Sequence, residues 1–208
     1  MKKKREKELA SKKALQLLFK LAGKRKLILG LGSGTTIAIF VKLLGKSGLK
    51  NSLKIIPSSA QIEKKARKAG LKLVRKGKPA IAVDGADQIN KKGEMLKGHG
   101  ALAFVHEKEL DYAAKKAIFV IDKSKISKLT KPVLIEVKAN KLKKIKEKLR
   151  RFDCKIIKEI KHDKNKILFL QFKKIKNPKR LEQKLNKLGI IGNGIFACFK
   201  KRPIIVTN

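Results

Sequence analysis

The sequence is poor in the features that mark secreted or membrane proteins. It holds two cysteines, Cys154 and Cys198, which lie far apart and lack the companion ligands of a disulfide framework or a zinc site. Its apolar runs are all too short to span a bilayer. Residues 1–20 pass from charges straight into an amphipathic pattern, without the separate apolar core and cleavage site of a signal peptide. We therefore expect a cytoplasmic protein with reduced cysteines and no membrane partner.

Acidic and aromatic residues are also scarce. Only 16 residues are acidic against 56 basic ones, the formal net charge is +40, and aromatic residues make up 5% of the chain. Nucleic-acid binders cluster their basic residues and use arginine forks and stacking aromatic rings, whereas here lysine is spread over the predicted exposed helix faces. We therefore expect no specific nucleic-acid partner. The charge should still favour anionic substrates and weak, salt-sensitive RNA binding.

What the sequence does contain is a regular alternation of strand and helix patterns over its first part. A hydrophobic fraction of 42% in 208 residues is enough for a sizeable core. Strands that alternate with helices imply a parallel sheet with ligand groups at the carboxyl ends of its strands. The predicted strands are 26–31, 53–56, 71–74, 80–83 and 117–121, and the predicted helices are 7–21, 37–44, 60–69 and 109–115.

The pattern changes after Lys131-Pro132, which we predict to be a hinge. The order becomes β-α-β-β-α-β, which suggests a ferredoxin-like split-βαβ unit, and one last strand, 203–206, returns to the first sheet. The fold class is thus α/β: a Rossmann-like parallel-sheet domain (1–130 plus 203–208) with a smaller α+β domain (131–202) inserted near the C-terminus. The second part has predicted strands 133–137, 154–160, 167–172 and 195–199, with helices 141–151 and 178–188.

A glycine loop, GLGSGTT at Gly30–Thr36, joins the first strand of the parallel sheet to a helix. This arrangement aims free backbone N–H groups at a phosphate, and Ser33, Thr35 and Thr36 add hydroxyl donors. The loop lacks the Gly-Lys-Ser/Thr end of a nucleotide P-loop, and Thr35 stands where a dinucleotide fingerprint needs a third glycine. A cradle for a small phosphate remains, beside the alternative of a tight turn with a Ser/Thr helix cap.

A second stretch, Ala80–Lys108, collects acid–base residues. Asp84 and Asp87 follow a buried strand, Lys97 lies among glycines, and Glu107 follows an apolar segment. This set of three carboxylates and one lysine suits proton transfer next to a carbonyl group. A carboxylate can act as the base that removes the proton, and the lysine ammonium can stabilise the oxyanion that develops. The alternative for the two aspartates is a structural turn with Asx capping.

Six motifs in order, with compatible spacing, resemble those of ribose-5-phosphate isomerase of the A type. A seventh, Asn193-Gly-Ile-Phe-Ala197, is similar to the NGIFA segment of archaeal members. The six are GLGSGTT at Gly30–Thr36 (GxGTGST in the family), PSSAQ at Pro57–Gln61 (PTSxQ), DGADQIN at Asp84–Asn90 (DGADEI), LKGHGA at Leu96–Ala101 (KGxGA), Glu107-Lys108 (EK) and Asp122-Lys-Ser-Lys125 (D-x-S-K).

The resemblance implies reversible isomerisation of D-ribose 5-phosphate and D-ribulose 5-phosphate through an enediolate, in the non-oxidative pentose phosphate pathway. It implies no metal or cofactor, and a homodimer or homotetramer. By motif position, Glu107 is the base between C2 and C1, Asp84 and Asp87 handle hydroxyl protons and ring opening, and Lys97 stabilises the enediolate oxygen. The implied substrate-binding residues are Ser33, Gly34, Thr35, Thr36, Gly85, Ala86, Gly98, His99, Gly100 and Lys125.

Two departures from the family pattern bear on this site. Gln88 stands where the family has glutamate, and the segment from Lys97 to Glu107 is one residue longer. The imidazoles of His99 and His106 lack metal-like partner spacing, so we expect both side chains to be bystanders. Two alternative functions are a metal-dependent sugar phosphatase, which a chelator would inactivate, and a sugar-phosphate-binding regulator, which would bind without turnover.

Overall fold

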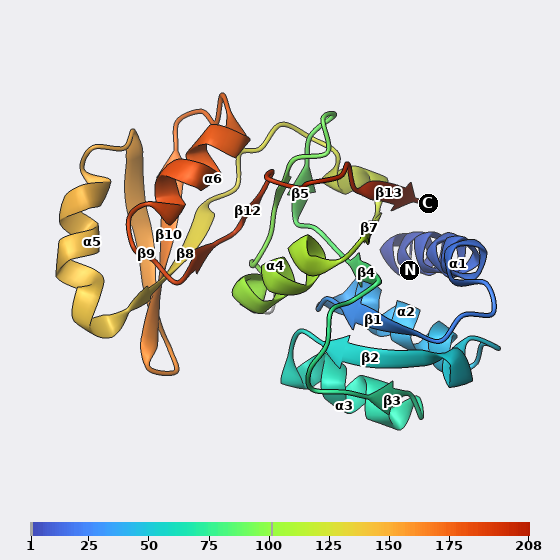
Figure 1. Ribbon diagram of the computed structural model, residues 1–208. Coiled ribbons are helices and arrows are strands. Elements are labelled where there is room, and N and C mark those ends of the chain that lie inside the picture. The colour runs from blue at the N-terminus through green and yellow to red at the C-terminus, as the bar shows by residue number, and fades with distance from the viewer. Residues whose placement is uncertain (1, 101) are drawn as a thin grey trace. The chain divides into compact units, whose positions relative to one another are not determined.

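The computed structural model describes residues 2–100 and 102–208, which group into two compact units (Figure 1). The first unit consists of the chain up to Ala86, His106–Lys125 and Phe199–Asn208. The second consists of Asp87–Val105 and Ile126–Cys198. The chain thus first leaves the first unit directly after Ala86. The hinge at Lys131-Pro132 stays a prediction.

A six-stranded sheet with every pair parallel forms the first unit, as the alternation of strands and helices predicts. The last strand, β13, returns from the far end of the sequence to pair with β7. The order is β13-β7-β4-β1-β2-β3, with β1 (Leu27–Leu31), β2 (Leu53–Pro57), β3 (Lys72–Leu73), β4 (Ile81–Asp84), β7 (Lys116–Ile121) and β13 (Ile204–Thr207).

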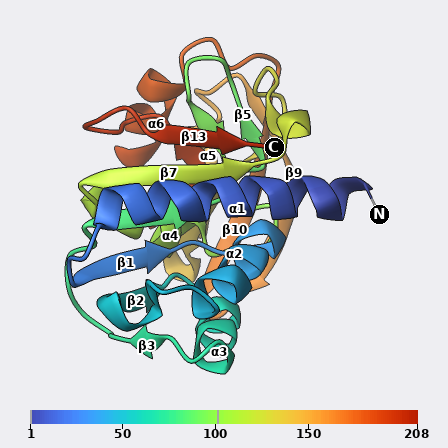
Figure 2. The same cartoon turned by 90° about the vertical axis from the view of Figure 1, so that its right-hand side faces the viewer.

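Helices cover this sheet on both faces. α1 lies along β7 and β13 and packs on α2 (Figure 2). Leu29 and Leu31 point into the core that these helices share, whereas Gly30 between them faces the other side, where an added Cβ would lie 3.4 Å from Leu110 Cβ. The helices are α1 (Lys2–Ala22), α2 (Thr35–Gly45), α3 (Ala60–Lys68) and α4 (Phe104–Ala113), with short 3-10 turns at Lys50–Ser52 and Lys123–Lys125.

The second unit contains the predicted βαββαβ arrangement. Its antiparallel sheet has the order β11-β8-β10-β9, so each helix connects two strands separated by one other strand. This is the order of a ferredoxin-like unit, as predicted. The elements are β8 (Val133–Lys138), a 3-10 turn (Ala139–Lys141), α5 (Leu142–Leu149), β9 (Cys154–His162), β10 (Asn165–Phe172), α6 (Pro178–Asn186) and β11 (Gly192–Asn193).

The closing strand of this unit differs from the prediction of a strand over 195–199. β11 ends at Asn193, and β12 (Ile195–Phe196) leaves the sheet to pair with β6 (Met95–Leu96), which pairs in turn with β5 (Gln88–Ile89). Gly194 marks the switch, because a Cβ there would lie 2.4 Å from the carbonyl oxygen of Lys97. The apolar pattern of the sequence does not show this change of sheet, because strands of two residues are too short to have a recognisable period.

Among the described residues, no helix combines the length and hydropathy that a membrane span requires.

Cys154, at the start of β9, is expected to be an inert thiol. Burial, with a smaller contribution from the charge of Asp153, raises its pKa to about 11. Below that pH the thiolate, which is the reactive form, is a minor species. Iodoacetamide at pH 8 should therefore modify Cys154 at least about tenfold more slowly than a free cysteine of pKa about 8.5. Peptide mapping over time measures this rate, and modification at the free-cysteine rate would contradict the expectation.

Candidate active site

Glu107 lies in the first turn of α4, is 4% exposed, and turns toward the glycine loop of the same unit. Its Oε1 accepts the Ser33 backbone N–H at 3.2 Å and also the Ser33 hydroxyl. The extra residue after Lys97 therefore does not withdraw Glu107 from the loop. Leu102, which lies in this longer segment, has φ 55, a left-handed conformation rare outside glycine.

Asp84 ends β4 and is 1% exposed, in close contact with the same loop. Its Oδ1 accepts the N–H of Gly85 at 2.6 Å, and the Gly32 N–H donates to Val83 O at 3.0 Å. A Cβ on Gly32 would lie 1.7 Å from Asp84 Oδ1. Glycine at position 32 is thus what allows the carboxylate to lie against the loop backbone, while Gly85 and Ala86 form the half-buried turn that follows.

Replacing Gly32 with alanine should therefore displace the Asp84 carboxylate. We expect kcat/KM to fall about 10- to 100-fold, since misplacing a reacting group by about 1 Å can cost 10²-fold. Steady-state kinetics with D-ribose 5-phosphate, the substrate that the family resemblance implies, measures the effect. Gly48→Ala is the matched control, because a Cβ at Gly48 meets nothing within 4 Å. Equal kinetics for the two variants would show that Asp84 does not need this close packing.

The N-terminus of α2 follows the loop and presents backbone N–H donors. Gly34, with φ 93, precedes the helix and makes no side-chain cap, and its carbonyl accepts the N–H of Ala38 as the first helical bond. The N–H groups of Thr35 and Thr36 therefore have no acceptor within the helix. Such an end attracts anions through these donors and through the helix dipole.

Lys7 adds a cation to this end of α2, and the sequence analysis did not identify it. Its Nζ donates to Thr35 Oγ1 at 2.7 Å from α1. Nothing in the local pattern distinguishes Lys7 from its lysine-rich surroundings, because a distance of 28 positions in the chain separates it from its partner. Only the packing of α1 on α2 brings it to the loop.

In the second unit, Asp87 orders the segment that contains Lys97 and the neighbouring glycines. Its N–H donates to Leu96 O at 2.9 Å, and its Oδ2 accepts the His99 N–H at 3.0 Å. The His99 ring binds elsewhere: Nε2 lies 2.8 Å from Pro132 O, and the ring meets Phe169 edge-on. His99 thus contributes a backbone donor to the loop while its imidazole packs within the small unit.

Lys97 is 3% exposed, an unusual environment for an ammonium. Its N–H donates to Gly194 O at 2.9 Å, and its Nζ lies 5.0 Å from the centre of the Phe196 ring. Gly98 has φ 110, and a Cβ there would approach Phe104 Cδ1 to 2.7 Å. Gly100 is exposed, and Ala101, the last residue of the LKGHGA motif, lies outside the described residues.

Gln88 has a structural role that a glutamate could not fill in the same way. It is 8% exposed, its Nε2 donates to the hydroxyls of Ser127 and Thr130, and its Oε1 accepts the N–H groups of Thr130 and Lys131. A carboxylate has no N–H to donate, so these two contacts could form only with the hydroxyls as donors. The Gln88 side chain therefore connects β5 to residues 127–131 within the second unit.

Lys125 and His106 lie in the first unit without direct bonds to the loop among the contacts described. The Lys125 N–H donates to Asp122 O at 3.0 Å in the turn after β7. His106 is exposed, and its Nδ1 lies 2.9 Å from Glu109 Oε2. Over residues 2–100 and 102–208, no group of three or more His, Cys, Asp or Glu side chains could hold a metal ion.

Comparison with known proteins gives one consistent result. The family "Ribose 5-phosphate isomerase A (phosphoriboisomerase A)" matches residues 54–208. A ribose-5-phosphate isomerase A of Pyrococcus horikoshii is 32% identical over 222 residues, 97% of this chain and 93% of that protein. One of Korarchaeum cryptofilum is 44% identical over 123 residues, a match that spans 58% of this chain and 52% of that relative.

A solved structure of a D-ribose-5-phosphate isomerase in complex with phospho-erythronic acid has the same fold. Its TM-score to this chain is 0.82 at 31% identity, and the match covers 93% of this chain and 90% of that one.

Proposed function

Since the chain belongs to the ribose 5-phosphate isomerase A family, its activity is that of an aldose–ketose isomerase, and we propose how its residues divide the work on D-ribose 5-phosphate. Glu107 transfers the proton between C2 and C1. Lys97 stabilises the oxyanion of the enediolate, and Asp84 and Asp87 handle the hydroxyl protons and ring opening. The reaction belongs to the non-oxidative pentose phosphate pathway.

The observation that carries this proposal is the buried carboxylate of Glu107 held by Ser33. A base that moves a proton between neighbouring carbons must be fixed within reach of both, because its efficiency depends on geometry before basicity. Held by these two bonds, the carboxylate of Glu107 takes the proton from C2. Returning that proton to C1 completes the isomerisation without any external oxidant or reductant.

The phosphate of the substrate has a matching set of donors at the start of α2. The backbone N–H groups of Thr35 and Thr36, their hydroxyls and the Lys7 ammonium offer hydrogen bonds and positive charge. Phosphate binding there supplies energy remote from the reacting carbons, which can orient them. The phospho-erythronic acid bound by the related isomerase is likewise an anionic sugar phosphate derivative.

The proposal is tested by incubating the purified protein with D-ribose 5-phosphate and measuring D-ribulose 5-phosphate. Turnover should persist in excess EDTA, because the proposed chemistry needs no metal. Inactivation by EDTA with recovery on Mg²⁺ would favour the metal-dependent phosphatase, and release of inorganic phosphate would identify it. Binding of the sugar phosphate without turnover would favour a regulator.

Ser33→Ala tests the positioning of Glu107. Loss of the hydroxyl removes one of the two Ser33 donors to Oε1, so we expect kcat to fall about 10- to 100-fold, in line with the roughly 1.5–3 kcal/mol of a hydrogen bond to a charged group. KM should change less than kcat. Ser33→Thr restores the hydroxyl and should restore kcat, which a purely structural role would not require. A Ser33→Ala enzyme with unchanged kcat would contradict this role.

We also propose a homodimer or homotetramer in the cytoplasm, which light scattering on the purified protein and cell fractionation measure directly. A monomer at working concentration would contradict the first of these proposals, and recovery with the membrane fraction would contradict the second.

A further inference from the structure

A cavity in the first unit lies away from the candidate catalytic residues. Its volume is about 340 Å³, and it opens where the strands of the parallel sheet begin. Lys78 precedes β4, Lys116 is the first residue of β7, and Ile204 is the first residue of β13. Asp84 stands at the other end of β4, so the cavity and the glycine loop lie at opposite edges of one sheet.

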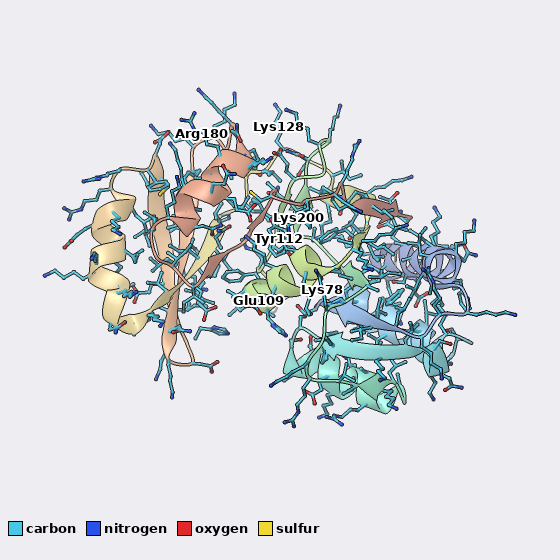
Figure 3. All side chains as sticks on the ribbon, in the orientation of Figure 1. Lys78, Glu109, Tyr112, Lys128, Arg180 and Lys200 are labelled. Atoms are coloured by element: carbon cyan, nitrogen blue, oxygen red, sulfur yellow. The ribbon has the colours of Figure 1, made fainter. Side chains whose placement is uncertain are left out.

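The cavity collects positive charge from three separate segments of the chain. Six lining residues are basic and one, Asp111, is acidic, which gives a formal charge of 6 − 1 = +5. Gathering like charges around one concavity is unfavourable without an anion, and a concave surface of one sign concentrates counter-ions. The six are Lys78, Lys115, Lys116, Lys200, Lys201 and Arg202, and Figure 3 labels Lys78 and Lys200 with Tyr112 beside α4.

In a lysine-rich chain, positive charge alone does not distinguish this cavity from the rest of the surface. Another cavity, on α2 and α3, is lined by four lysines and otherwise by alanine, valine and glycine residues. What distinguishes the first cavity is an aromatic wall. The rings of Tyr112 and Phe199 meet edge-to-face with centroids 4.8 Å apart, and Phe199 packs at 5.6 Å on the fully buried Phe119.

This wall is a fixed surface because it is anchored in the core of the sheet. The edges of aromatic rings carry partial positive charge, and the Tyr112 hydroxyl is a further donor. A rigid wall limits the entropy lost on binding, while the long lysine side chains reach across the opening. A volume of about 340 Å³ falls in the range of small-molecule sites.

We propose that this cavity is a second anion site, which binds an oligophosphate group. A single phosphate would leave most of the six cations uncompensated, whereas linked phosphates bring several negative charges into one compact ligand. The group could be carried by a nucleoside triphosphate or stand alone as inorganic tripolyphosphate. This site goes beyond the proposed isomerase function, since none of its lining residues belongs to the catalytic or substrate-binding set.

Calorimetric titration of the full chain with ATP, tripolyphosphate and adenosine tests the proposal at about 0.1 M salt, where the Debye length is about 10 Å. ATP and tripolyphosphate should both bind, and adenosine should not. ATP binding much more tightly than tripolyphosphate identifies the nucleotide as the ligand, and equal affinities identify the phosphates alone. Saturating ribose 5-phosphate should leave this binding in place.

Two double variants, each replacing two lysines with glutamate, distinguish binding in this cavity from attraction to the positively charged surface as a whole. Lys116→Glu with Lys200→Glu should weaken oligophosphate binding about 100-fold or more, because charge-assisted contacts become repulsive. Lys42→Glu with Lys46→Glu, in the cavity on α2 and α3, should change it less than about threefold through screened long-range charge. Both pairs should retain isomerase activity, which also reports that each variant is folded.

Three outcomes would overturn the proposal. The two pairs could weaken binding equally, which would make the attraction a property of the whole charged surface. Ribose 5-phosphate could displace the ligand, which would place binding at the glycine loop. A single-stranded RNA could bind far more tightly than tripolyphosphate and lose affinity with both pairs, which would indicate a nucleic-acid surface. If the isomerase assay failed but the first pair alone lost binding, the second site would stand without the proposed function.

Discussion

Glu107→Gln should lower kcat about 10²- to 10⁴-fold, the range that a positioned general base contributes. The amide has nearly the shape of the carboxylate, so its oxygen can still accept the two Ser33 donors seen at Oε1. It cannot take a proton from C2. Because the shape is retained, substrate should still bind, and KM should change far less than kcat.

Steady-state kinetics gives kcat and KM, and exchange of the C2 proton with solvent deuterium reports the proton-transfer step alone. Glu109→Gln is the matched control: it lies on the same helix, but its side chain is exposed and meets His106 instead of the loop. We expect this control to keep full activity. A fully active Glu107→Gln enzyme would show that another group is the base.

Lys97→Met should lower kcat about 10²- to 10³-fold, the loss typical for removal of one donor to a developing oxyanion. Methionine is unbranched and apolar, so it can fill the same buried space beside Phe196. The fold should therefore survive, and the lost charge should affect the enediolate more than the ground state. The expected signature is a lower kcat with a smaller change in KM.

Lys158→Met is the matched control in the same unit. Its Nζ also lies over a phenylalanine ring, 5.6 Å from the centre of Phe169, but Lys158 is exposed on β9. Replacing it removes the same charge and the same kind of ring contact, and should leave kcat unchanged. Thermal melting of both variants checks the fold. A kcat for Lys97→Met within twofold of the control would remove Lys97 from the oxyanion role.

The long elements of both units could be predicted from the sequence because their periodicity comes from burial. β1, β2, β4 and β7 are apolar runs that become central strands, and a parallel sheet covered on both faces needs such runs. The short pairings could not be predicted. β5, β6, β11 and β12 have two residues each, too few for any period, and β11 and β12 pair with segments distant in the chain.

The sequence by itself also singled out the candidate catalytic groups. Acid–base chemistry needs residues such as Asp, Glu and Lys, and the stretch Ala80–Lys108 places them after an apolar strand and among glycines. Their roles rest on the family motifs and remain proposals. The partners of these groups required the tertiary structure. Ser33 meets Glu107 across 74 positions, and Lys7 meets Thr35 across 28.

Tertiary structure alone decided two further matters. Gln88, which stands where the family has glutamate, both donates and accepts bonds within the second unit, and no local pattern reveals these partners. The basic cavity joins Lys78, Lys116 and Lys200, whose proximity follows only from where β4, β7 and β13 begin in the sheet. Local composition determines which chemistry a chain can perform, whereas contacts between distant segments determine which copies of a common residue take part, because identical lysines differ only in their neighbours.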